Sequence, residues 1–103
     1  MKNENEIRID AQNIYREVAT MEVNEMNGYV NTPADDERYE RISKELDEAM
    51  EECFAAGCFV ELKNICQQMF SASMERRKYF EVFSNWFEQP YWLGKMMDAG
   101  IAF

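Results

Sequence analysis

The sequence predicts an all-α fold, a small bundle of three to four helices without a β-sheet. Apolar residues recur every three or four positions in several segments, which is the period of one helix face. The 103 residues include four glycines and two prolines, too few for the turns of a strand-rich fold. The apolar content of 47% is sufficient for one packed core, so we expect a single domain, residues 1–103.

The first predicted helix begins near Glu6 and ends before the Asn27-Gly28 pair, which favours a turn. Asn3 or Asn5 is a suitable N-cap. The apolar residues of this segment are spaced alternately by four and three positions, which places them on one face: Ile7, Ala11, Ile14, Val18 and Met21.

The second predicted helix covers residues 33–56 and has the clearest start signal. Thr32 is the expected N-cap, Pro33 occupies the first helical position, and Asp35 stands where the acidic residue of a capping box is found. Gly57 is the expected stop. The apolar stripe between these signals consists of Tyr39, Ile42, Leu46, Ala49, Met50 and Cys53.

Helical spacing resumes after Gly57 and continues to Gln89. Residues 59–71 and 73–88 form either one long helix or two helices, with Ser73 as a fresh cap in the second case. Pro90 then opens a short last helix that Gly100 closes. From these patterns we expect eight residues in the core, namely Ile14, Val18, Ile42, Leu46, Leu62, Ile65, Phe80 and Phe83.

Charge and bulk are distributed unequally between the two halves of the chain. Residues 1–52 carry 15 acidic and 6 basic side chains, a net charge of −9, whereas residues 53–103 carry 5 of each. Eleven of the fourteen aromatic residues lie in this neutral second half. A strongly acidic chain is a poor ligand for nucleic acid itself, because phosphate contacts supply most of that affinity. It suits a basic protein partner instead.

The composition excludes several kinds of chemistry. Without histidine there is no Ser-His-Asp or Cys-His catalysis and no histidine-containing zinc site. Clustered helix carboxylates can hold magnesium in nucleotide pyrophosphohydrolysis, but pairs such as Glu37/Glu40 are common in any glutamate-rich helix and no Glu-x-x-Asp accompanies them. We expect no enzyme, no catalytic residue, no cofactor and no metal site. Three cysteines, Cys53, Cys58 and Cys66, are expected to be reduced core residues of a cytoplasmic protein.

No apolar stretch approaches the roughly 20 residues that a membrane span requires, and the polar start "MKNENEIRID" lacks the apolar segment of a signal peptide. We therefore expect no membrane partner.

The polar face of the second helix is the first candidate partner-binding surface. Its stretch "DEAMEE", residues 47–52, places like charges four positions apart at the helix end where the dipole disfavours anions. Residues that disfavour their own helix and have no visible compensation indicate a functional constraint. Acidic helix faces, however, also serve solubility. The acidic-face candidates are Asp36, Glu37, Glu40, Asp47, Glu48, Glu51 and Glu52.

The aromatic and methionine residues near the C-terminus form the second candidate surface. They surround the axis of the last helical segments, so we expect that they cannot all face inward and that a second chain covers them. The interface candidates are Trp86, Tyr91, Trp92, Met96, Met97 and Phe103.

These surfaces favour a non-enzymatic inhibitor or adaptor that binds a basic, nucleic-acid-handling protein. Phage anti-restriction and anti-CRISPR proteins, nuclease immunity proteins and antitoxins share its size, charge and fold class, and a carboxylate face can mimic DNA. The alternative is a homo-oligomeric regulatory or structural protein, for example a homodimer, that associates through its aromatic C-terminal segment.

Overall fold

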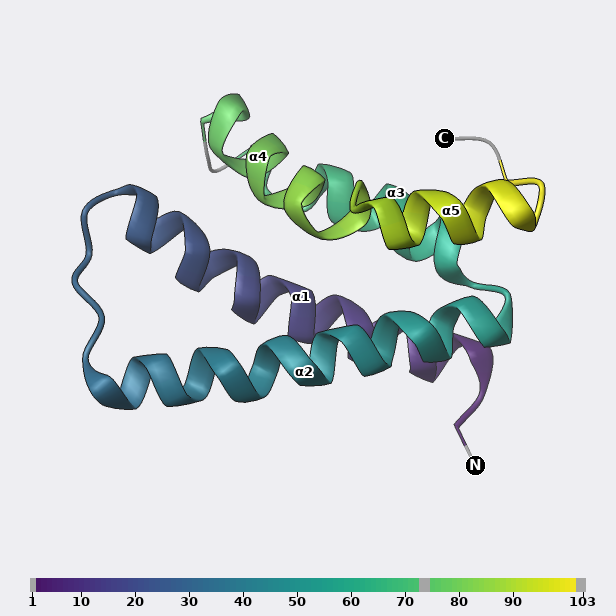
Figure 1. The fold of residues 1–103 in the computed structure, drawn as a ribbon, viewed down its shortest axis with the longest axis horizontal. Helices are drawn as coiled ribbons and strands as arrows, with labels where there is room; N and C mark the ends of the chain where they lie inside the picture. The colour runs from purple at the N-terminus through teal and green to yellow at the C-terminus, as the bar shows by residue number, and fades with distance from the viewer. Residues whose placement is uncertain (1, 73–74, 102–103) are drawn as a thin grey trace.

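The computed structural model describes residues 2–72 and 75–101 and contains five α-helices within them (Figure 1). No residue in these ranges is in a strand, so the predicted all-α class is confirmed, with at least one helix more than the three or four expected. The helices are α1 (Glu4–Met26), α2 (Pro33–Ala56), α3 (Phe59–Gln68), α4 (Arg76–Phe87) and α5 (Pro90–Asp98).

The ends of α1 and α2 follow from local side-chain chemistry. The Asn3 side chain accepts a hydrogen bond from the Glu6 amide at 2.9 Å and caps α1. At the start of α2, the Thr32 hydroxyl accepts from the Asp35 amide at 3.2 Å, and the Asp35 carboxylate accepts from the Thr32 amide at 2.9 Å. This reciprocal capping box and the bounds 33–56 are as predicted.

Gly57 ends α2 in the left-handed region, with φ at +84°. The amide of Cys58 then donates to the carbonyl of Cys53 at 3.0 Å, and the amide of Gly57 donates to that of Phe54 at 3.3 Å. These two bonds form a Schellman motif, which satisfies carbonyl groups that the helix end leaves free. A residue with a Cβ atom would be strained at this φ, so glycine is required here.

The second half of the chain forms separate helices rather than one continuous helix. α3 ends at Gln68 and α4 starts at Arg76. Ser73, the predicted fresh cap, lies outside the described residues. The interruption matters because it lets α4 turn back and pack on α1 instead of extending away from the hairpin.

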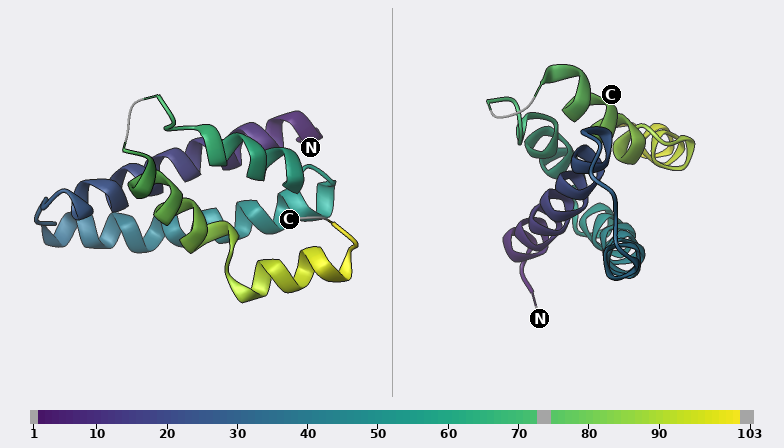
Figure 2. Two further views of the ribbon diagram at one scale, coloured as in Figure 1. Left: turned by 90° about the horizontal axis from the view of Figure 1, so that it is seen from above. Right: turned by 90° about the vertical axis from the view of Figure 1, so that its left-hand side faces the viewer.

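α1 and α2 are antiparallel and form a long hairpin, and the other three helices lie on one side of it (Figures 1 and 2). α4 runs obliquely across α1, while α5 lies beside the C-terminal end of α2. One face of α2 therefore stays free of other helices. In the described residues no helix is both long and apolar enough to cross a membrane.

One hydrophobic cluster joins all five helices, and aromatic rings occupy its centre. The Phe59 ring stacks on Trp92 with centroids 4.9 Å apart and contacts Phe87 at 5.7 Å. Phe87 in turn lies against Tyr15 of α1 at 5.6 Å, and Phe54 of α2 lies against Phe59 at 5.6 Å. Such ring pairs contribute about 0.5–1.5 kcal/mol each beyond the area that they bury.

Five of the eight predicted core residues are buried in this cluster: Val18, Ile42, Leu46, Leu62 and Phe83. The other three, Ile14, Ile65 and Phe80, are only half-buried, so the prediction overestimated their burial. Ile14 packs against the edge of the core. Phe80 is near the exposed start of α4, where it stacks on Tyr79 at 4.9 Å and lies under the Arg76 guanidinium at 5.1 Å.

A half-buried carboxylate, Glu22, joins α1 to both α2 and α4. Trp86 Nε1 donates to Glu22 Oε2 at 2.7 Å, and the Tyr39 hydroxyl donates to Oε1 at 3.2 Å. Burial raises the pKa of the Glu22 carboxyl above its ordinary value of 4.5, and the charge of Glu25 adds to the rise, while both hydrogen bonds oppose it. Burial is the largest cause, so the ionised side chain costs stability in the folded state.

We expect Glu22→Gln to stabilise the fold at neutral pH, because glutamine keeps an acceptor for Trp86 and removes the buried charge. The raised pKa means that folding favours the protonated acid, so the penalty in the wild type is full at high pH and disappears as pH falls through that pKa. The advantage of the variant in urea unfolding should therefore shrink in acid. Equal or lower stability at neutral pH would contradict this role, and exposed Glu81→Gln is the control.

We expect Leu46→Ala to lower the free energy of unfolding by about 2–5 kcal/mol, the usual cost of such a core truncation. Leu46 is 0% exposed in the hydrophobic cluster that joins the five helices, so its truncation removes packed apolar contacts. Chemical denaturation measures the change, with Val30→Ala in the exposed hairpin loop as the control. A loss below about 1 kcal/mol would show that this face of α2 is not in the core.

Candidate partner-binding site

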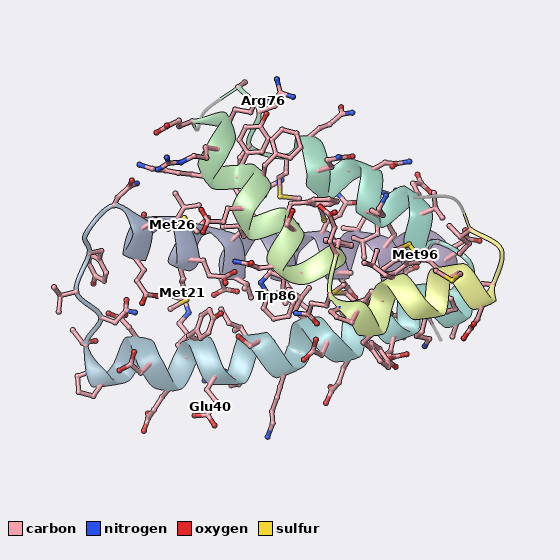
Figure 3. The ribbon with its side chains drawn as sticks, turned by 45° about the horizontal axis from the view of Figure 1, so that its top comes forward. Met21, Met26, Glu40, Arg76, Trp86 and Met96 are labelled. Atoms are coloured by element: carbon pink, nitrogen blue, oxygen red, sulfur yellow. The ribbon has the colours of Figure 1, made fainter. Side chains whose placement is uncertain are left out.

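The acidic face of α2 points to solvent, as the sequence predicts. Ile42, Leu46 and Met50 direct the opposite face of the helix into the core. In Figure 3, Glu40 projects away from the other helices. Of the seven predicted acidic residues, Glu51 is half-buried and six are exposed: Asp36, Glu37, Glu40, Asp47, Glu48 and Glu52.

The N-terminal half of this face carries mixed charge. Arg41 and Lys44 line a shallow surface groove together with Glu37 and Glu40. The i,i+4 spacing predicts ion pairs among them, but none of these pairs lies within 4.0 Å in the described residues. Exposed pairs gain little over hydration, so such side chains need not close on one another. The charges nevertheless neutralise one another locally.

The C-terminal half of the face is different, and Glu51 corrects the expectation that its acids have no partners. Lys95 Nζ of α5 lies 2.6 Å from Glu51 Oε2, and the Tyr91 hydroxyl donates to Oε1. These two hydrogen bonds, with the lysine charge, hold the pKa of the Glu51 carboxyl below its ordinary value. Both partners are more than 35 residues away in sequence, so the sequence of α2 alone does not indicate them.

Asp47, Glu48 and Glu52 remain without an ion pair within 4.0 Å in the described residues. Partial burial raises the pKa of the Asp47 carboxyl, and the nearby charge of Glu51 adds to the rise. The negative charge is therefore least compensated in the C-terminal half of α2.

A groove of about 330 Å³ adjoins these acids, between the C-terminal half of α2 and the start of α5. We call it the α2–α5 groove. Three carboxylates and no basic side chain line it, and an exposed tyrosine forms part of its wall. Its lining residues are Asp47, Glu48, Glu51, Gln89, Tyr91 and Trp92.

A second groove, of about 340 Å³, lies between α1 and the start of α2. Its charges are balanced, because Arg16 and Arg38 face Glu17 and Asp35, and Arg38 pairs with Glu17. A balanced polar groove offers no preference for a charged partner. The α2–α5 groove is therefore the stronger candidate site.

The expected C-terminal interface is largely core. Trp86, Trp92 and Met96 are 7%, 1% and 0% exposed within one chain, so the premise that they cannot all face inward is wrong for these three. The turn between α4 and α5 separates their faces and lets each contribute to the same cluster. Tyr91 and Met97 are 56% and 67% exposed, and Phe103 lies outside the described residues.

The three cysteines are buried in the core. Burial raises the pKa of the Cys53 thiol to about 12, with a smaller contribution from its neighbour Cys58, and burial likewise raises the pKa of Cys66. Thiols in this environment stay protonated at neutral pH and are weak nucleophiles. In residues 2–72 and 75–101, no group of three acidic or thiol side chains is arranged to hold a metal ion.

Lys95 and Gln89 are the site residues that sequence reasoning missed. Lys95 is the only basic residue after position 78, and it lies one helical turn from Tyr91, so the two share one face of α5. This spacing is a sequence signal that could have indicated a polar contact on a segment that otherwise reads as apolar.

Comparisons of the chain with protein-family models, with curated proteins and with solved structures give no significant match. We therefore infer the function from the charged and hollowed surface features of the chain itself.

We expect the triple variant Asp47→Asn, Glu48→Gln, Glu52→Gln to fold and to be as stable as the wild type or slightly more so. Neutralisation removes the like-charge repulsion of the i,i+4 pairs 47/51 and 48/52, worth about 0.2–0.5 kcal/mol for each pair. Glu51→Gln should instead lose a small amount of stability, because it breaks the contact with Lys95. Thermal unfolding at low salt measures both changes, and a marked destabilisation of the triple variant would contradict this assignment.

Proposed function

We propose that this protein is a non-enzymatic inhibitor or adaptor that binds a basic, nucleic-acid-handling protein through the acidic face of α2. The observation that carries the proposal is the run of carboxylates along the outer face of α2. Six of them are exposed, and the half-buried Glu51 alone is ion-paired within the described residues. Such a surface attracts a positively charged target from a distance and speeds its capture.

The energetic cost of this surface supports a binding role. Like charges at positions 47 and 51 and at 48 and 52 repel each other near the C-terminus of α2, and the fold compensates only Glu51. For solubility alone, the same number of acids could be placed near helix N-termini, where the dipole stabilises them. A cationic partner would relieve the repulsion when it binds.

The spacing of the acids supports mimicry of a nucleic acid strand. From Asp36 to Glu52, the seven acidic-face residues and the exposed Glu45 occupy about 24 Å of helix, roughly one acid per 3 Å. A DNA strand carries a phosphate about every 3.4 Å. A groove that tracks the phosphates of DNA could thus accept this face, as expected of an anti-restriction, anti-CRISPR, immunity or antitoxin-like inhibitor.

Self-association through the aromatic C-terminal segment has less support. Its largest side chains, Trp86 and Trp92, are already buried in the chain's own core, and Met96 is buried with them. Among the described interface candidates, the exposed side chains that remain are Tyr91 and Met97, which are too few to form the apolar centre of a dimer interface.

The test is a binding panel of purified, basic DNA- and RNA-processing proteins, including nucleases. We expect the wild type to bind at least one member, to compete with duplex DNA for it, and to lose affinity steeply as salt rises. The triple variant Asp47→Asn, Glu48→Gln, Glu52→Gln should bind at least about tenfold more weakly and with a shallower salt dependence.

The matched control is Glu4→Gln, Glu25→Gln, Glu81→Gln, which removes the same charge from other exposed positions. It should retain most of the affinity. Failure to bind any member of the panel, or equal losses in the two triple variants, would contradict a binding role for the α2 face.

A further inference from the structure

We propose that the α2–α5 groove binds an arginine side chain of the partner, with the guanidinium held between the carboxylates of α2 and the ring of Tyr91. This inference rests on the proposed function and specifies the chemistry of its contact. The acidic face as a whole attracts positive charge, whereas the groove selects one kind of cationic side chain.

The negative charge of the groove favours a cationic side chain. Asp47, Glu48 and Glu51 line the groove, and only Glu51 has a cation, supplied by Lys95 at 2.6 Å. Two carboxylates therefore face the groove without an ion pair within the described residues. Partial burial and Glu51 already disfavour the charged form of Asp47. A second cation placed between Asp47 and Glu48 would offset one of the two negative charges that Lys95 leaves uncompensated.

The ring of Tyr91, which forms part of the groove wall, favours a planar cation. Tyr91 is 56% exposed, and its ring and that of Trp92 form an edge-to-face pair, with centroids 5.0 Å apart and planes at 77°. Its hydroxyl is fixed by Glu51, so the ring is held in place beside the groove. A tyrosine fixed in this way, with more than half of its surface in water, provides a face on which a planar cation can stack.

The chain's own Lys95 already places a cation at the edge of this site. The Lys95 ammonium lies 4.5 Å from the centroid of the Phe54 ring and 5.5 Å from those of Tyr91 and Trp92. The same carboxylate and the same tyrosine ring that contact Lys95 also line the groove. The combination of Glu51 with aromatic rings thus retains a positive charge in the folded protein itself.

Arginine fits the remaining space better than lysine does. A guanidinium is planar, stacks on an aromatic face, and presents several N–H donors that can engage two carboxylates at once, whereas an ammonium is a compact point charge. Tyr91 supplies the face, and Asp47 and Glu48 supply the acceptors. The groove volume of about 330 Å³ suits one side chain rather than a folded element.

The test uses two labelled glycine–serine peptides that differ only in carrying arginines or the same number of lysines. Fluorescence anisotropy with the full chain measures both affinities. We expect the wild type to prefer the arginine peptide by at least about fivefold. The variants Asp47→Asn/Glu48→Gln and Tyr91→Leu should each reduce that preference to within about twofold, and circular dichroism and thermal unfolding check that they fold.

The comparison variant Glu37→Gln/Glu40→Gln removes the same charge from the acidic face outside the groove. It should weaken both peptides alike and leave the arginine preference intact. If the wild type shows no preference for the arginine peptide, or if Tyr91→Leu leaves that preference unchanged, the proposed arginine site is contradicted. The proposal of a general acidic binding surface is not affected by this result. If neither double variant weakens either peptide, the acidic face does not bind basic chains, and the proposed function fails as well.

Discussion

The contact between Phe59, Phe87 and Trp92 determines how the rest of the molecule is arranged. These rings come from α3, α4 and α5 and meet at centroid distances of 4.9 and 5.7 Å for the two pairs that include Phe59. The helices α1 and α2 supply aliphatic residues and only three aromatic ones, Tyr15, Tyr39 and Phe54. The aromatic cluster supplies further bulk and holds three short helices on one side of the hairpin.

The same contact places the candidate site. Burial of Trp92 brings the start of α5 against the end of α2, and Tyr91 and Lys95 then reach Glu51. Because all three covering helices lie on one side, the outer face of α2 keeps its carboxylates in water. The acidic half of the sequence thus carries the candidate surface, while most of the aromatic residues in the core come from the neutral half.

Local signals in the sequence predict local structure well here. The caps of α2 involve residues at most five positions apart, so its predicted bounds agree with those of the structure. The exposure of its acidic face also follows from helical periodicity alone. The burial of Trp86, Trp92 and Met96 does not, because it depends on where the chain turns between α3, α4 and α5. If these segments are treated as one continuous helix, their apolar residues lie on all sides of its axis.

The partners of the half-buried polar groups are equally non-local. Glu22 is separated from Trp86 by 64 positions, and Glu51 from Lys95 by 44. No pattern within one helix indicates such pairs, and only the packing of distant elements reveals them. The groove beside Asp47 and Glu48 has the same origin, since residues of α2 and of the start of α5 form its walls.

The most direct test of this account is a nuclear magnetic resonance titration of the full chain, labelled with nitrogen-15, with an arginine-rich peptide. The account predicts that the largest amide shift changes fall in residues 45–52 and in Gln89, Tyr91 and Trp92, in or next to the two walls of the α2–α5 groove. Residues 27–32 of the hairpin loop and the helix α3 should change little. Shift changes spread evenly over all acidic residues, or centred on the loop, would contradict a specific site on this face of α2.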